Sequence, residues 1–109
     1  MTAETLDTMR RDMTAAAASL ADATRRADAA YDAMLAAALP IADAIAIGGA
    51  PSDSAVTAFR IRRESLAASY DAADLARLRF HAAAEKFRIS ESANRAAVIA
   101  DERKLQEGR

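Results

Sequence analysis

His81 and Glu85 are the first pair whose types and spacing could do chemistry. Residues four apart lie on one face of a helix, where an imidazole and a carboxylate can share a metal ion. The chain has a single histidine and no cysteine. One chain would therefore supply only half of a ligand set. We expect no metal site and no cofactor, and we interpret the two residues as a solvated surface pair.

Arginines form the second candidate site, because short runs of them can bind phosphates. Acidic residues such as Glu64, Asp71 and Asp74 interleave with these runs, and the net charge of the chain is −1. Mixed charges along a helix are typical of a solvated face with ion pairs. Nucleic-acid contact is therefore the alternative function, not the leading one. Its candidate residues are Arg60, Arg62, Arg63, Arg77, Arg79 and Arg88.

The segment IAIGGAPSDSAV, residues 45–56, could be either a phosphate-binding loop or a bend. A phosphate-binding loop would need a preceding strand and the pattern G-x-x-x-x-G-K-[ST], and the sequence has neither. Gly48 and Gly49 instead predict the end of a helix, and Ser52 or Asp53 predicts the N-cap of the next. We therefore expect a turn at residues 48–52.

The elements on either side of this turn are expected to be two long helices, at residues 3–47 and 53–106. Alternate steps of three and four along the first helix meet an apolar residue every time, which is the pattern of a packed helix. Pro40 predicts a kink in it. The apolar positions of the first helix are Leu6, Met9, Met13, Ala16, Leu20, Ala23, Ala27, Ala30, Met34, Ala37, Ile41 and Ala44. A step of seven along the second helix gives Phe59, Leu66, Ala73, Phe80 and Phe87.

An antiparallel pairing of the two helices explains both patterns, if facing residue numbers add up to about 100. Met34 then meets Leu66, Ala27 meets Ala73, and the remaining large residues pair in the same way. The fold class is therefore all-α: a coiled-coil-like helical hairpin that forms one domain over residues 1–109. The alanine row of the first helix is predicted to lie beside Arg63, Tyr70, Arg77 and Ala84.

Several large apolar residues lie off this seam, and a chain with two helices has no third helix to cover them. Stripes at helical spacing are usually buried by something, so we expect another chain to cover them and to complete the packing. The predicted partner-binding residues are Leu75, Leu78, Ile89, Tyr31, Leu35 and Ile45.

The function predicted from these features is that of a non-catalytic structural or assembly subunit. It would self-associate or pack on other subunits of a complex such as a virion. The sequence contains no nucleophile–base arrangement, and a two-helix hairpin has no cleft in which carboxylates could converge, so we do not expect an enzyme. The alternative is a small regulator or adaptor that binds a protein or nucleic acid through the arginine face of the second helix.

The predicted location is the cytoplasm or the interior of an assembled particle. No secretion signal is visible, because no basic segment leads into an apolar one. Residues 33–50 are apolar, but Asp43 makes them a poor membrane-spanning helix, so we expect no membrane insertion.

Overall fold

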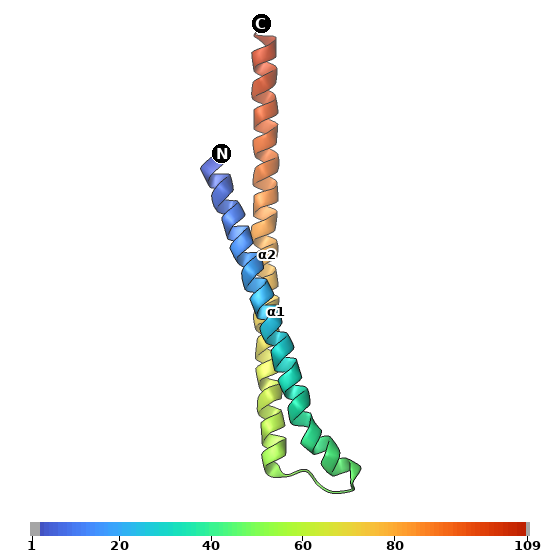
Figure 1. Cartoon of the computed structure of the whole chain (residues 1–109). Coiled ribbons are helices and arrows are strands. Elements are labelled where there is room, and N and C mark those ends of the chain that lie inside the picture. The colour runs from blue at the N-terminus through green and yellow to red at the C-terminus, as the bar shows by residue number, and fades with distance from the viewer. Residues whose placement is uncertain (1–2, 109) are drawn as a thin grey trace. The chain divides into compact units, whose positions relative to one another are not determined.

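The chain folds as an all-α helical hairpin. A computed structural model describes residues 3–108, in which helix α1 spans Ala3–Ala46 and helix α2 spans Asp53–Glu107. The two helices run antiparallel and are joined by a short turn (Figure 1). The predicted fold class is confirmed, and both helices begin and end within one residue of the expected positions. Residues 3–108 contain no strand.

The hairpin divides into two compact units, each containing part of both helices. One unit is Ser19–Arg77, which includes the turn, and the other combines Met1–Ala18 with Leu78–Arg109. The single domain expected from the sequence stays a prediction.

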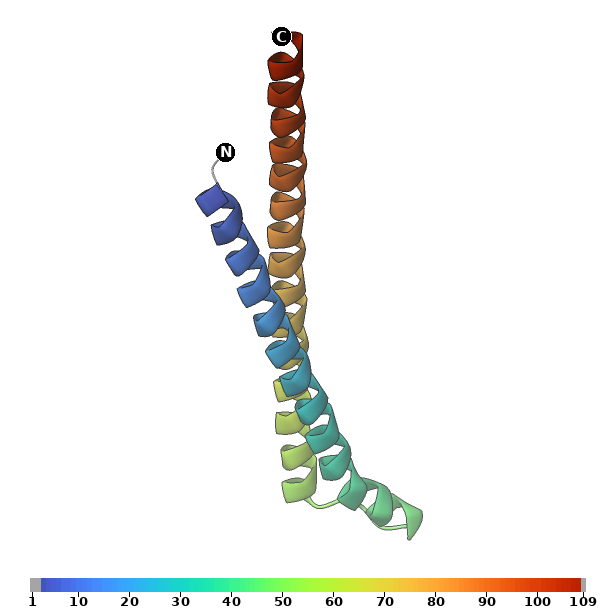
Figure 2. The same cartoon turned by 45° about the horizontal axis from the view of Figure 1, so that its top comes forward.

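Two glycines end α1 by hydrogen bonding back onto its last turn. Gly48 has a φ of 77°, in the left-handed region that glycine adopts without strain. Its N–H donates to the carbonyl of Ile45 at 3.0 Å, and the N–H of Gly49 donates to the carbonyl of Ala44 at 2.9 Å. This pair of bonds is a Schellman motif, which satisfies carbonyls that the helix end leaves free. The expected helix stop is therefore confirmed, and Figure 2 shows the turn that follows it.

Ser52 caps the start of α2. Its Oγ accepts a hydrogen bond from the N–H of Ala55 at 3.1 Å, which is the usual N-cap contact. Asp53 follows in the first turn, where the helix dipole favours a negative charge. Of the two residues that the sequence offered as N-cap, Ser52 takes the role.

Replacing Gly48 with alanine is expected to lower the free energy of unfolding by about 1 kcal/mol. The left-handed conformation costs a residue with a Cβ about 1–2 kcal/mol, and the lower entropy of the unfolded chain offsets part of this cost. An added Cβ meets no atom within 4 Å, so the backbone alone is responsible. Gly49→Ala is the matched control, because Gly49 lacks a positive φ. Urea unfolding followed by circular dichroism measures both, and equal stability of the two variants would contradict the prediction.

Pro40 lies inside α1, and the helix continues through it to Ala46. Proline has no N–H, so the carbonyl of Ala36 loses its partner within the helix. Both residues are exposed, so this carbonyl lies on the solvent side. The predicted kink at Pro40 stays a prediction.

The apolar seam of α1 is confirmed by its burial. All twelve seam positions are buried or half-buried, from Leu6 to Ala44. Between Thr5 and Ala46, the only other positions with comparable burial are Asp22, Ala33 and Ala38. The step of three and four residues therefore identified the packed face of this helix.

The large row of α2 is confirmed in the same way, but its second row was predicted wrongly. Arg63, Tyr70 and Arg77 are exposed, although they were expected beside the alanine row of α1, whereas the fourth expected residue, Ala84, is half-buried. The alanines of α1 leave little space between the helices, and a tyrosine ring or an arginine does not fit there. Small residues fill the second row instead: Ser69, Ala76, Ala83 and Ser90.

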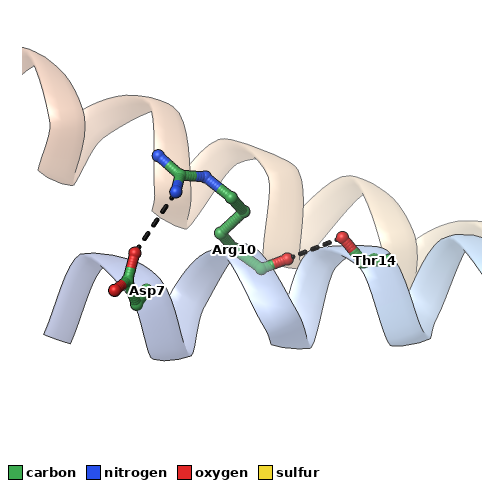
Figure 3. Close-up of polar contacts among 3 residues, drawn as sticks. All are labelled: Asp7, Arg10 and Thr14. Atoms are coloured by element: carbon green, nitrogen blue, oxygen red, sulfur yellow. Dashed lines mark hydrogen bonds and ion pairs between the residues drawn. The ribbon is translucent and has the colours of Figure 1, made fainter. Parts of the chain in front are cut away.

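On α2, the contacts with α1 lie a few residues nearer the turn than facing numbers that add up to 100 would place them. The predicted facing pairs themselves stay a prediction. The guanidinium carbon of Arg10 lies 5.4 Å from the centroid of the Phe87 ring, whereas the predicted register places Ser90 opposite Arg10. Figure 3 shows Arg10 reaching from α1 toward the neighbouring ribbon while it pairs with Asp7 at 3.2 Å. Thr14 donates to the carbonyl of Arg10 at 2.9 Å.

The same displacement occurs in the unit Ser19–Arg77. There Arg26 lines one groove together with Ser65, Ser69 and Ala72. Its neighbour Ala27 is buried, as are Leu66 and Ala73, which follow Ser65 and Ala72. These three are the buried apolar residues among those described.

Candidate interaction surfaces

Shallow grooves mark one face of each unit. In the unit Ser19–Arg77, a groove is lined by Arg26, Ser65, Ala68 and Ala72, each of which directly precedes a seam residue. In the other unit, Asp12, Ala82 and Lys86 line a groove and also precede seam residues. Residues just before the seam therefore share one face on both helices. We call this the groove face. The grooves are open, and no set of acidic or basic groups converges in them.

The opposite face of the unit Ser19–Arg77 carries exposed apolar residues. Each directly follows a seam residue, and a step of one residue turns a helix by about 100°. Residues after the seam must therefore share the face opposite the grooves. We call this set the tyrosine face, with exposed fractions in parentheses: Tyr31 (43%), Leu35 (46%) and Ile45 (61%) from α1, and Val56 (42%) and Tyr70 (49%) from α2.

Three of the six predicted partner-binding residues belong to the tyrosine face. Val56 and Tyr70 were missed by the sequence reasoning. Val56 follows Ala55 and Tyr70 follows Ser69, two partly buried seam positions that the packed hairpin identifies.

Of the other three predicted residues, all on α2, two belong to the second unit and are called the outer stripe: Leu78 and Ile89. The full set is Leu75, Leu78 and Ile89. They are 47%, 67% and 54% exposed, respectively. Leu75 belongs to the unit Ser19–Arg77, and the other two belong to the second unit. Leu75 and Ile89 each precede a seam residue, so they lie away from the tyrosine side of α2. The six predicted residues therefore do not form one patch.

The six predicted arginines are all exposed, and most lie on the tyrosine side of α2. Arg79 precedes Phe80 and lies on the other side, whereas Arg62 occupies a position of the second seam row. Those that follow a seam position are Arg60, Arg63, Arg77 and Arg88.

Part of this positive charge is neutralised on the same helix. Arg77 pairs with Asp74 at 2.9 Å, and Arg88 pairs with Glu85. The Arg63 guanidinium carbon lies 6.0 Å from the centroid of the Phe59 ring. Arg60 donates a long hydrogen bond to the Thr57 hydroxyl at 3.4 Å. Arg60 and Arg63 are therefore the cations most available to a partner on this side.

Glu85 is engaged by Arg88 and not by His81. The hydrogen bond from Arg88 lowers the pKa of Glu85, and the same bond raises the pKa of Arg88. The centroid of the exposed His81 ring lies 5.8 Å from the centroid of the Phe80 ring, and the two rings are tilted relative to each other. Within residues 3–108, no three His, Asp or Glu side chains cluster in a way that could hold a metal ion.

Helix α1 is long and apolar enough to cross a membrane, judged by its length and composition alone. Its segment Thr5–Ala46 contains an 18-residue window of mean hydropathy 1.4, and none of that window is buried. Core helices of soluble proteins and signal sequences can have the same length and hydropathy. The predicted location, and the predicted absence of membrane insertion, stay predictions.

No protein-family model, curated protein or solved structure matches the chain. Its surfaces are therefore the basis for a functional proposal. In the unit Ser19–Arg77 they offer the exposed apolar side chains of the tyrosine face, with Arg60 and Arg63 on the same side of α2.

Proposed function

We propose that the chain is a non-catalytic assembly subunit, which self-associates or packs on other subunits through its exposed apolar residues. One observation carries the proposal. Among the residues described, the buried apolar side chains are Ala27, Leu66 and Ala73, whereas fourteen large apolar side chains are at least 42% exposed. The hairpin leaves most of its large apolar side chains to the solvent or to a partner.

The energetics favour a partner. Each large aliphatic side chain contributes about 1.5–3 kcal/mol when it is fully buried. Two helices with a seam rich in alanine gain little from their own core, while they pay the full cost of ordering the chain. Contact with further chains would supply the missing burial. A multi-subunit particle such as a virion would suit a small connector of this kind, and this last step is an analogy of architecture.

The molar mass in solution tests the proposal directly. One chain has a mass of 11.5 kDa. We expect light scattering at micromolar concentration to give a multiple of this mass. A stable monomer with these residues exposed would contradict the proposal.

A double variant of the outer stripe, Leu78→Gln with Ile89→Gln, is expected to lower the molar mass of the largest assembly or abolish incorporation into the complex. It should leave the helical circular dichroism signal largely intact, because both side chains are exposed. Leu66→Gln is the matched control in the seam, where a polar group should melt the helices themselves. An unchanged mass would exclude the outer stripe as the contact.

A regulator or adaptor that binds through arginines is the second candidate function. The observation that favours it is the gathering of Arg60, Arg63, Arg77 and Arg88 on one side of α2. Affinity for a DNA duplex should then fall steeply with salt concentration, whereas an apolar assembly contact should not weaken in this way.

A further inference from the structure

We infer that the tyrosine face binds the tyrosine face of a second copy, with α1 of each copy packed on α2 of the other. The inference rests on the proposed function and adds the partner and the geometry. The two-fold axis of this dimer runs along the helices, so both contacts are equivalent.

Charge decides which helices face each other across this dimer. From Ala27 to Ala50, α1 and the turn after it carry Asp28, Asp32 and Asp43 and no basic residue. Across residues 60–64, α2 carries three arginines and one glutamate. A dimer that sets α1 on α1 would place like charges together, whereas α1 on α2 places opposite charges together. Asp28 follows the seam residue Ala27, so it lies on the tyrosine face itself.

Side-chain size supports the same pairing. On α1, the residues of the tyrosine face are also spaced by alternate steps of three and four. Ala38 and Ala42 are the steps between Leu35 and Ile45. This stripe has the spacing of a second seam, with small residues between large ones. On α2, Ala67 separates Arg63 from Tyr70 in the same manner. Large residues of one helix can therefore lie against small residues of the other.

The two tyrosines suit a protein contact better than a fully buried core. Tyr31 and Tyr70 are each more than 40% exposed. A tyrosine ring buries a large area, while its hydroxyl still needs a polar partner, so the residue is common at interfaces. A carboxylate such as Asp28 is an acceptor of that kind on the facing copy.

Two charge-reversal variants test the pairing: Asp28→Lys with Asp32→Lys on α1, and Arg60→Glu with Arg63→Glu on α2. Each variant alone places like charges across both contacts, so its self-association should weaken about tenfold or more. An equimolar mixture of the two should recover wild-type affinity, because both contacts of the mixed dimer are again complementary. Sedimentation measures the affinities, and circular dichroism verifies the helices.

The matched control is Arg79→Glu with Arg103→Glu, which changes the net charge equally on exposed arginines outside the tyrosine face. It should dimerise like the wild type and should not rescue the α1 variant fully. The neutral variant Arg60→Gln with Arg63→Gln replaces the α2 variant if reversed charges unfold the helix, with a smaller expected loss.

Three results would overturn the inference. Self-association unchanged by either reversal would mean that α1 faces α1, that another face is used, or that charge does not matter. Weakening without rescue in the mixture would mean that α1 and α2 do not face each other. A monomeric wild type would overturn the proposed function as well, whereas the first two results would leave it standing.

Discussion

Replacing Leu66 with alanine is expected to lower the free energy of unfolding by about 2–4 kcal/mol. Leu66 is the largest of the three buried apolar residues and is 7% exposed. The cost has two parts: the lost transfer free energy of the removed methyl groups and the free energy of the cavity that remains. Together they amount to about 2–4 kcal/mol for a leucine in a core. Urea unfolding followed by circular dichroism measures the loss. The protein concentration must be equal for all variants, because self-association adds to the apparent stability.

The matched control is Leu39→Ala, which makes the same chemical change at a side chain that is 61% exposed and belongs to neither the tyrosine face nor the outer stripe. Changes on an exposed surface are usually within about 0.5 kcal/mol. The difference between the two variants therefore isolates burial in the seam. Equal losses at the two positions would mean that the seam of α2 does not run through Leu66.

The packed face of α1 and the large row of α2 could be predicted from the sequence because they depend on local spacing alone. A helix repeats every 3.6 residues, so a row of apolar residues from Leu6 to Ala44 fixes the side that is buried. The turn could also be predicted, because it depends on a few neighbouring residues. Gly48 and Ser52 each adopt a conformation or make a hydrogen bond that few other residue types provide.

The register between the helices could not be predicted in this way. A shift along the seam leaves large residues near large ones in several arrangements, so the pattern alone does not select one. The selection comes from how the side chains of the two helices fit together in space. The same limit explains why Tyr70 was placed wrongly. The second seam row of α2 can lie on either side of its large row, and the facing helix decides which side packs.

The candidate interaction surfaces were predictable residue by residue but not as groups. Leu35 and Leu78 are both exposed, as expected for residues off the seam. Their assignment to different faces needs the seam positions of both helices at once, and these follow only from the packed hairpin. Val56 and Tyr70 were missed for the same reason.

Replacing Ala27 with glutamate is expected to destabilise the hairpin by about 3–5 kcal/mol, which is the usual cost of a buried charge without a partner. Ala27 is 5% exposed, the lowest fraction among the buried apolar residues. The carboxylate has no room between the helices, so it must either lose its hydration shell or push the helices apart. Burial raises the pKa of a carboxyl group, so the loss of stability should shrink as the pH falls and the introduced group becomes neutral.

Ala29→Glu is the matched control, because it makes the same change two residues along the same helix at an exposed position. It adds the same charge to the chain and has the same effect on helix propensity, so only the place on the helix differs. We expect a change within about 0.5 kcal/mol for this variant, with little dependence on pH. Thermal and urea unfolding at pH 4 and pH 7 separate the two outcomes. If Ala27→Glu is as stable as Ala29→Glu at neutral pH, the helices do not pack closely at Ala27. The alanine row would then not be the place where the backbones approach.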